Sequence, residues 1–378
     1  MKFGGTSLAT VDRIGHVADR AIAAHRAGGR IVVVVSAIAG ETNRLLDLAG
    51  AIEPGSACRE LDLIAATGEQ VAAGLMVLAI LKRGVAARAL LGHQVRIVTN
   101  ASFGAARIER VETDSLLAAL GAGEIVVVAG FQGVTAAGEI TTLGRGGSDT
   151  TAVAIAAALD ARTCEIYTDV DGVYTADPSV CPDVRKLSRV SFAAMLALAE
   201  RGAKVLHAPC VAMARDHDVP ILVAHAHRDH EGTWVTTKDD PDPMVGIALD
   251  RAVVALAPRS CEVARADEAL ARAGIAFDRV GELLVVATSN LARSIGTIAA
   301  DGVSDVHVEE VARVTLVGRD AAAVTSAAFE HVGAAHRFGV GTTPELVTVI
   351  VTRPHADDVT RALHASLLQS VRRYQLVA

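Results

Sequence analysis

The sequence predicts an α/β protein: an α/β/α sandwich with a mainly parallel sheet, followed by two small ferredoxin-like units. Strand-like and helix-like segments alternate through the first two thirds of the 378 residues, which is the pattern of a parallel sheet covered by helices. The all-apolar segment 31–37 suits a strand that is buried on both faces. After the charged, proline-bearing stretch 236–244, the pattern changes to β-α-β-β-α-β, repeated twice.

In the first part, most predicted helices end at a glycine, and the predicted strands are short and rich in valine and isoleucine. Strands are predicted over 31–37, 87–92, 95–100, 124–131, 164–170 and 220–226. Helices are predicted over 11–29, 61–84, 111–123, 149–161 and 191–202, and a hairpin over 132–143.

The second part divides into two repeats of one plan. The first repeat has predicted strands over 251–258, 275–280, 282–289 and 306–308, a helix over 261–274, and a short helix between the last two strands. The second has strands over 312–318, 335–340, 345–351 and 372–377, and helices over 320–333 and 355–368. We therefore expect three domains, over residues 1–236, 244–309 and 310–378.

Composition excludes several classes of protein. The net charge of −7 and the lack of a basic stripe argue against a nucleic-acid partner. Five scattered cysteines without a C-x-x-C pair indicate a reducing compartment, and the apolar runs are shorter than a bilayer span. We expect a cytoplasmic protein that does not enter the membrane. The histidines of 225–230 are predicted to be solvated rather than metal ligands, and no metal site is predicted.

Four segments carry residues suited to chemistry: 2–7, 141–159, 167–180 and 202–209. A turn, a surface loop and a helix end would explain the first, third and fourth segments without any function. A capped helix explains only part of the segment 141–159, because it needs neither Arg145 nor a third glycine. Such an arginine could form a bidentate pair with a carboxylate. No P-loop, G-x-G-x-x-G, H-E-x-x-H or G-x-S-x-G pattern is present at the required place.

An ordered set of motifs resembles the aspartate kinases, which have the amino-acid-kinase fold. The motifs are K-F-G-G-T-S, V-V-V-V-S-A, T-G-E, A-G-F-Q-G-V, T-L-G-R-G-G-S-D-T-T-A, Y-T-D-V-D-G-V-Y-T-A-D-P and G-A-K-V-L-H. Each motif alone is weak evidence for the family, but the ordered set is specific for it. The resemblance runs from residue 2 to about residue 235. The second part is similar to the regulatory ACT domains of that family. The resemblance implies ATP-dependent phosphorylation of the β-carboxylate of L-aspartate to 4-phospho-L-aspartate, with Mg²⁺ carried on the phosphates. It also implies a homodimer or higher homo-oligomer formed through the ACT-like region.

The resemblance also assigns roles to individual residues. ATP would be bound by Lys2, Phe3, Gly4, Gly5, Ser36, Thr168, Asp169, Tyr174, Asp177 and Lys204. Aspartate would be bound by Thr42, Glu69, Arg145, Gly146, Gly147 and Ser148, with Glu69 on its ammonium group and Arg145 on its α-carboxylate. The catalytic residues would be Lys2, Asp149 and Lys204, with Asp149 orienting the lysines. Because a carboxylate acceptor is already ionised at neutral pH, this chemistry needs positioning and cations rather than a general base.

Three features depart from the family pattern. Lys2 directly follows Met1, where the family has several apolar residues; either the true start lies upstream or the first strand is unusually short. The loop reads D-P-S at 177–179 instead of D-P-R, which predicts weaker ATP binding. The turns at 257–264 and 318–325 lack the glycine- and proline-bearing turn of family effector sites, which predicts insensitivity to lysine and threonine.

Two other functions stay open. The acceptor could be the carboxylate of a related amino acid, because acceptor choice depends on few side chains. Alternatively, the chain could be a catalytically impaired kinase-like sensor. The short first strand and Ser179 favour this alternative.

Overall fold

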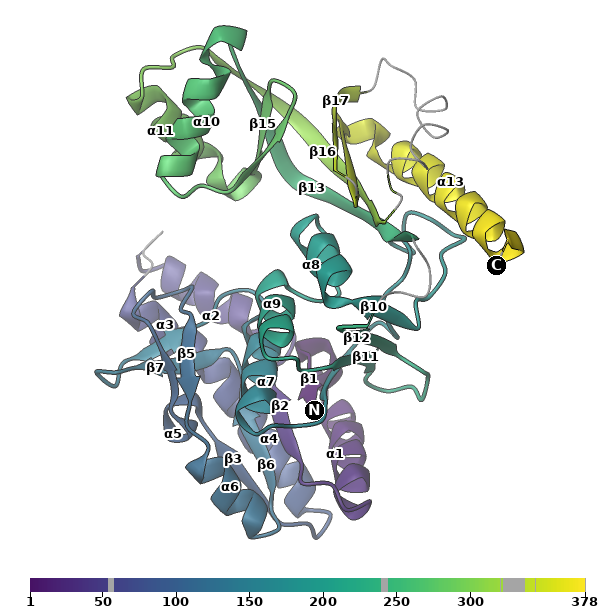
Figure 1. Ribbon diagram of the computed structural model, residues 1–378. Helices are drawn as coiled ribbons and strands as arrows, with labels where there is room; N and C mark the ends of the chain where they lie inside the picture. The colour runs from purple at the N-terminus through teal and green to yellow at the C-terminus, as the bar shows by residue number, and fades with distance from the viewer. Residues whose placement is uncertain (54–57, 239–243, 320, 322–336, 344, 378) are drawn as a thin grey trace. The chain divides into compact units, whose positions relative to one another are not determined.

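The structure is a computed structural model that describes residues 1–378 except 54–57, 239–243, 320, 322–336, 344 and 378 (Figure 1). The chain forms two compact units. Unit 1 consists of Met1–Val173, Ser188–Leu196 and Val205–Asp239. Unit 2 consists of Tyr174–Leu187, Ala197–Lys204 and Asp240–Ala378, so it takes two segments from within the first part of the chain.

Unit 1 is built on an eight-stranded sheet with the order β10-β12-β11-β9-β1-β2-β6-β3. Its strands are β1 Lys2–Phe3, β2 Val32–Val35, β3 Ala87–Leu90, β6 Ile125–Ala129, β9 Cys164–Thr168, β10 Arg189–Ser191, β11 Ile221–His225 and β12 Thr233–Thr236. All neighbours pair in parallel except β11 and β12, so the predicted mainly parallel sheet is confirmed. In β1, Lys2 lies opposite Val34 of β2 and Ile166 of β9. The carboxyl ends of these three strands therefore meet at one edge of the sheet.

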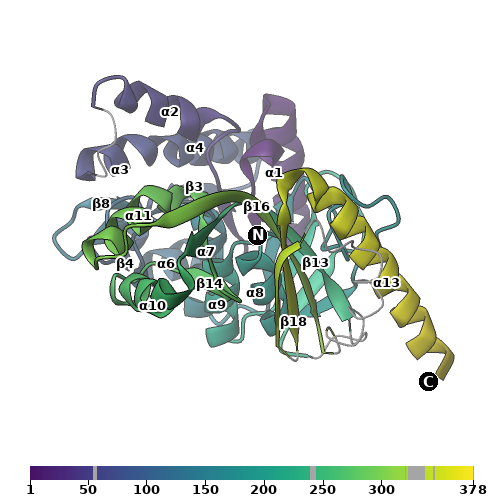
Figure 2. The same cartoon turned by 90° about the horizontal axis from the view of Figure 1, so that it is seen from above.

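Helices cover both faces of this sheet (Figure 2). Helices α1 (Val11–Arg26) and α4 (Thr67–Leu81) pack on one face, where Val33 and Val35 of β2 join their buried cluster. Helices α6 (Asp114–Gly121) and α7 (Gly147–Ala158) cover the other face. Residues 147–156 of α7 are all buried, which explains its run of small side chains. The all-apolar sequence of β2 follows from its burial between these layers.

The helix predicted over 61–84 is two consecutive helices, α3 (Arg59–Ala65) and α4. In the part of the chain that the structure describes, the stretch Arg59–Leu81 is the one helical stretch long and apolar enough to cross a membrane. Half of it is buried, and α4 packs against α1 and the sheet, as a core helix does. The remaining helices of the first 236 residues are η1 Gly5–Leu8, α2 Glu41–Gly50, α5 Gly92–Val95, α8 Phe192–Glu200 and α9 Ala208–Asp216.

A second, four-stranded sheet of unit 1 has the order β5-β4-β7-β8. Its strands are β4 Ile97–Thr99, β5 Ile108–Val111, β7 Gln132–Thr135 and β8 Ile140–Thr142. The antiparallel pair β7–β8 is the hairpin that the sequence predicts over 132–143. Strand β8 ends five residues before α7 begins, so this sheet delivers the glycine-rich segment to the start of that helix.

Unit 2 contains a six-stranded antiparallel sheet with the order β14-β15-β13-β16-β18-β17. Its strands are β13 Met244–Pro258, β14 Phe277–Val280, β15 Leu283–Ala287, β16 Val306–Gly318, β17 Arg337–Thr342 and β18 Leu346–Thr352. Its helices are η2 Ser260–Glu262, α10 Val263–Arg272, η3 Thr288–Asn290, α11 Leu291–Ala300, η5 Arg353–His355 and α13 Ala356–Val377. Strand β13 pairs with β15 of the first predicted repeat and with β16, which continues into the second repeat and pairs with β18. The two predicted repeats therefore share one sheet.

The strand predicted over 372–377 is wrong, because these residues continue α13. Its place is taken by residues 244–250 of β13, which pair with 313–318 of β16. The second repeat thus takes its fourth strand from residues 244–250, at the start of the domain predicted over 244–309. Residues 239–243 of the predicted linker, and all but one residue of the helix predicted over 320–333, lie outside the described residues.

Candidate active site

A cavity of about 270 Å³ in unit 1 lies where the carboxyl ends of β1 and β2 approach the start of α7. It is lined by the predicted site residues Lys2, Gly4, Gly5, Ser36, Thr42, Glu69, Arg145, Gly146, Gly147, Ser148 and Asp149. It is also lined by Ala37, Phe131, Gly144 and His207. Two larger cavities, of about 600 and 630 Å³, contain none of the predicted residues. Ligands of open α/β sheets bind at the carboxyl ends of the strands, so the smaller cavity is the candidate active site.

Glycines allow the backbone to come close to this cavity. A Cβ atom on Gly5 would lie 2.5 Å from the carbonyl oxygen of Ala37, so a side chain does not fit there. Gly146 precedes α7 with a φ of +74°, a conformation that L side chains rarely adopt. The start of α7, residues 147–149, lines the cavity, where a helix N-terminus favours an anion.

A buried ion pair joins the β1 strand to α7. The Lys2 Nζ lies 2.6 Å from Asp149 Oδ1, and each side chain is only 9% exposed. A buried ammonium group is stable when it has such a partner. The pair holds the lysine at the cavity, next to Gly4, whose added Cβ would be 3.7 Å from Nζ. Asp149 therefore pairs with Lys2, and its role in orienting the two lysines stays a prediction.

Glu69 brings a buried carboxylate to the cavity from the first turn of α4. The residue is 3% exposed, and its Oε1 accepts a hydrogen bond of 2.9 Å from the backbone N–H of Ala37. Its Oε2 is buried and has no hydrogen-bond partner among the described residues. Burial raises the pKa of this carboxyl group to about 7. An unpaired acceptor in a cavity is suited to an ammonium group of a ligand.

Arg145 differs from these residues because it is exposed. In the part of the chain that is described, no acidic side chain forms an ion pair with its guanidinium group. A planar group with free donors at the mouth of a cavity can take a carboxylate in a bidentate manner. Thr42 and Ser36 are half-buried and supply hydroxyl groups to the same cavity.

His207 was not singled out from the sequence, although it lies in the quoted motif G-A-K-V-L-H. It directly precedes α9, and its side chain lies against Gly146: a Cβ on that glycine would be 2.4 Å from the imidazole Cγ and Cδ2. Burial lowers the pKa of His207, so the ring is neutral at neutral pH. Its side-chain contact is with a residue 61 positions earlier, which local sequence does not reveal.

The predicted nucleotide-binding residues of unit 1 follow β9 and β1. Thr168 ends β9, and its hydroxyl donates a hydrogen bond of 3.1 Å to the carboxylate of Asp169, which is exposed. The Phe3 side chain is fully buried and stacks on Tyr167 with ring centroids 4.9 Å apart. Any contact of Phe3 with a nucleotide is thus limited to its backbone.

The other predicted nucleotide-binding residues, Tyr174, Asp177 and Lys204, belong to unit 2. Tyr174 forms an antiparallel bridge with Lys186. Asp177 Oδ1 accepts hydrogen bonds from the backbone N–H of Ser179 at 2.9 Å and from its hydroxyl at 2.7 Å. Lys204 is exposed. Ser179 therefore stabilises the loop itself.

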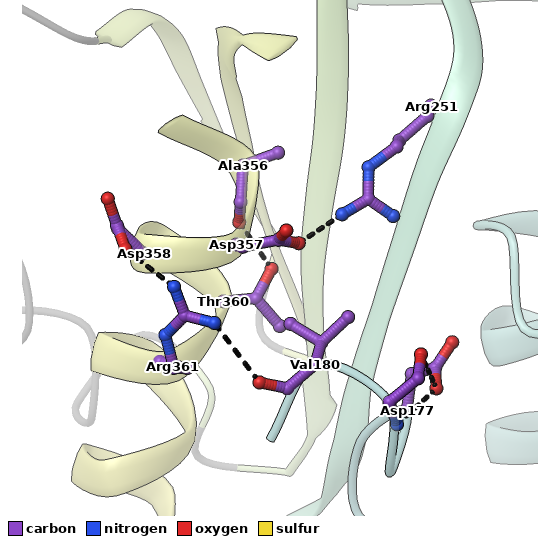
Figure 3. A network of polar contacts seen from close by, with 9 residues as sticks. Asp177, Val180, Arg251, Ala356, Asp357, Asp358, Thr360 and Arg361 are labelled. Carbon is purple, nitrogen blue, oxygen red and sulfur yellow. Dashed lines mark hydrogen bonds and ion pairs between the residues drawn. The ribbon is translucent and has the colours of Figure 1, made fainter. Parts of the chain in front are cut away.

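The segment 174–187 packs on α13 within unit 2. Arg361 of α13 pairs with Asp358 and donates a hydrogen bond of 3.3 Å to the carbonyl oxygen of Val180 (Figure 3). The Thr175 hydroxyl and His364 Nε2 lie 2.8 Å apart in the interior. The loop that carries Asp177 is thus anchored on a helix of the predicted ACT-like region.

His225, which ends β11, and His227 are less solvated than the sequence predicts, whereas His230 is exposed. His225 and His227 are half-buried, and both ring nitrogens of His227 are buried. Their ring centroids lie 6.2 Å apart, and His16 lies 6.0 Å from His227. Within the described residues, no group of three histidine, cysteine or acidic side chains is arranged to hold a metal ion.

The fold and the site define a member of a known family. Residues 1–225 match the Amino acid kinase family, and the chain belongs to it. Among its relatives, the aspartokinase of Pseudomonas aeruginosa is 50% identical over 255 residues, which cover 66% of this chain and 62% of that protein. The aspartokinase of Mycobacterium tuberculosis is 47% identical over 256 residues, which cover 66% and 61%. The chain thus spans less than two thirds of the length of these relatives.

Solved structures confirm the predicted fold class over nearly the whole chain. Escherichia coli aspartokinase III in complex with aspartate and ADP has a TM-score of 0.84 at 27% identity, with 97% of this chain and 99% of that chain covered. The aspartate kinase of Clostridium acetobutylicum has a TM-score of 0.76, with 97% and 99% covered. Because the sequence identity is 19%, this similarity is evidence for the fold alone.

Proposed function

We propose that this protein transfers the γ-phosphoryl group of ATP to the β-carboxylate of L-aspartate, giving ADP and 4-phospho-L-aspartate. The relatives are aspartokinases, and the similar E. coli enzyme was solved with aspartate and ADP. The observation that carries the proposal is that Lys2, Glu69 and Arg145 line one cavity. These are two cations and one unpaired carboxylate, the charges that complement a phosphoryl group and an amino acid.

The acceptor would be held by its α-amino and α-carboxylate groups. Glu69 Oε2, which has no other partner among the described residues, would take the ammonium group. Arg145 would take the α-carboxylate through two parallel hydrogen bonds. The β-carboxylate is then left facing Lys2, and its pKa near ~4 means that it attacks without a general base.

The donor would be placed by backbone N–H groups and cations. Gly5, Ser148 and Asp149 line the cavity, and their backbone N–H groups would suit phosphate oxygens. The N–H groups of Gly4 and Gly147 donate instead to the carbonyl oxygens of Tyr167 and Gly144. Lys2 would stabilise the charge on the transferring group, and Asp149 holds it in place. Mg²⁺ bound through the phosphates supplies further neutralisation of their charge. From the resemblance, Thr168, Asp169, Tyr174, Asp177 and Lys204 stay proposed nucleotide-binding residues.

Regulation and assembly are proposed on the same basis. The similar E. coli enzyme was also solved with lysine and aspartate, at a TM-score of 0.71 and 28% identity over 97% of this chain. In this chain the first ACT-like turn is the 3₁₀ turn η2, and the second lies mostly outside the described residues. We expect little or no inhibition by lysine or threonine, a homodimer or higher oligomer formed through the ACT-like region, and a cytoplasmic location.

Coupled ADP release tests the proposed function. The assay compares L-aspartate with L-glutamate and other amino diacids, each with and without lysine and threonine. Release that depends on aspartate supports the proposal, whereas preference for another diacid supports the related-kinase alternative. Binding of aspartate without any ADP release supports the sensor. Two variants form a matched pair. Arg145→Ala should abolish ADP release at low aspartate concentration. Arg30→Ala should not, because Arg30 is an exposed arginine outside the cavity.

A further inference from the structure

We propose that Asp62 is a positioning residue that fixes the Arg145 loop for the acceptor amino acid; this inference rests on the proposed function. Asp62 lies on α3, is 2% exposed, and does not line the cavity. Its two carboxylate oxygens accept hydrogen bonds from the Gly104 N–H at 2.9 and 3.0 Å. They also accept from the Thr142 N–H at 2.7 Å and from the Thr142 hydroxyl at 2.7 Å.

The partners of Asp62 are neutral. Among the ion pairs of the described residues, none involves Asp62. A buried carboxylate without a cation is costly unless several donors satisfy it. Here the donors come from two segments that lie 42 and 80 residues further along the chain. One side chain therefore ties three separate parts of unit 1 together.

Both tied segments lie beside Arg145. Thr142 ends β8, and three residues later the chain reaches Arg145. A Cβ on Gly144 would lie 3.1 Å from the carbonyl oxygen of Gly104, and the Ala106 N–H donates to the Thr142 carbonyl at 2.9 Å. The segments 104–106 and 142–144 therefore lie against each other, and Asp62 accepts hydrogen bonds from both of them. The approach of Gly144 leaves this loop little room to shift.

The same helical stretch also carries the proposed ammonium site. Glu69 follows Asp62 by seven residues, across the junction of α3 and α4 at Ala66. That junction is itself held, because the Gln132 side chain donates a hydrogen bond of 2.9 Å to the Ala66 carbonyl. Asp62 thus links the segment that bears Glu69 to the loop that bears Arg145. It sets the spacing between the groups proposed to hold the ammonium and the α-carboxylate of one amino acid.

The test compares Asp62→Ala with a matched control, Thr99→Val. The control removes another buried polar contact of the same small sheet, the 2.6 Å contact between the Thr99 and Thr141 hydroxyls. We expect Asp62→Ala to raise the KM for aspartate about 10- to 100-fold, because a displaced binding group costs that much. The KM for ATP should stay within about twofold, and Thr99→Val should change neither value. An unchanged KM for aspartate in folded Asp62→Ala would overturn the proposal.

A milder variant and a second readout cover other outcomes. Thr142→Val removes only one donor and should raise the KM for aspartate in the same direction, but less. Without any substrate, amide hydrogen exchange in 100–107 and 142–147 should be about tenfold faster or more in Asp62→Ala, and unchanged in Thr99→Val. Equal exchange in Asp62→Ala and wild type overturns the proposal. If the wild type releases no ADP with aspartate, the proposed function fails, and the exchange result still decides whether Asp62 fixes the loop.

Discussion

The buried carboxylate of Glu69 predicts how aspartate binding depends on pH. In the empty cavity, burial raises its pKa from the ordinary value of 4.5 to about 7. The proposed ion pair with the ammonium group requires the ionised form. With a pKa of about 7, only about 3% of the protein is ionised at this residue at pH 5.5, against about 90% at pH 8. We therefore expect aspartate to bind about 30-fold more weakly at pH 5.5 than at pH 8.

The same carboxyl group has an effect on stability with a defined sign. Because its pKa is higher in the folded chain, the folded chain keeps a proton that the unfolded chain loses above pH 4.5. The contribution of Glu69 to stability therefore falls as the pH rises from about 4.5 to about 7. The slope is about 1.4 kcal/mol per pH unit, and the total is roughly 3 kcal/mol. Bound aspartate should remove part of this loss, because its ammonium group favours the ionised carboxylate.

Glu69→Gln isolates the effect of the charge. The amide keeps the size of the side chain and can still accept the hydrogen bond from Ala37. The assays are the dissociation constant of aspartate by isothermal titration calorimetry and the free energy of unfolding in urea, both between pH 5.5 and 8. We expect the variant to bind aspartate weakly at all pH values and to lack the stability slope of the wild type. Equal pH dependence of binding in both proteins would refute the role given to Glu69.

Four further variants test other parts of the site. Lys2→Met should lower kcat about 100- to 1000-fold while calorimetry still detects aspartate binding; a kcat near wild type would contradict its role on the transferring group. Arg145→Ala should raise the KM for aspartate about 10- to 100-fold, and a wild-type KM would exclude its contact with the α-carboxylate. Gly146→Ala should destabilise the chain by roughly 2 kcal/mol in urea unfolding, because of its φ of +74° and the imidazole beside it; equal stability would show that the loop relaxes. Ser179→Arg should lower the KM for ATP by about two- to tenfold, because it restores a cation that the family has at this position. An unchanged KM would show that the lack of this cation does not weaken ATP binding.

Much of the fold follows from local sequence. The all-valine segment β2 and the small side chains of α7 indicate burial between layers, and the structure has them there. The glycines around Arg145 indicate a close backbone approach, which Gly146 makes at the side chain of His207. These features are local, so residue types and spacing are enough to predict them.

Other features depend on distant contacts. The segment 372–377 reads as a strand, but residues 244–250 fill its place in the sheet, and the end of the chain stays helical. The roles of Asp62 and His207 depend on residues at least 40 positions away. Glu69 is suggested only by a family motif, because nothing in T-G-E by itself shows that its carboxylate is buried and lacks a second partner. Contacts of this kind become visible only when the chain is folded.

Trapping of the product with hydroxylamine shows whether this protein phosphorylates a carboxylate. Acyl phosphates react with hydroxylamine to give hydroxamates, so transfer to a carboxylate should produce an aspartyl hydroxamate in step with ADP. We predict the β-hydroxamate of aspartate, in an amount that matches the ADP released and that falls to background in Lys2→Met. ADP release without a hydroxamate would show that the protein does not phosphorylate a carboxylate and would refute the proposed function.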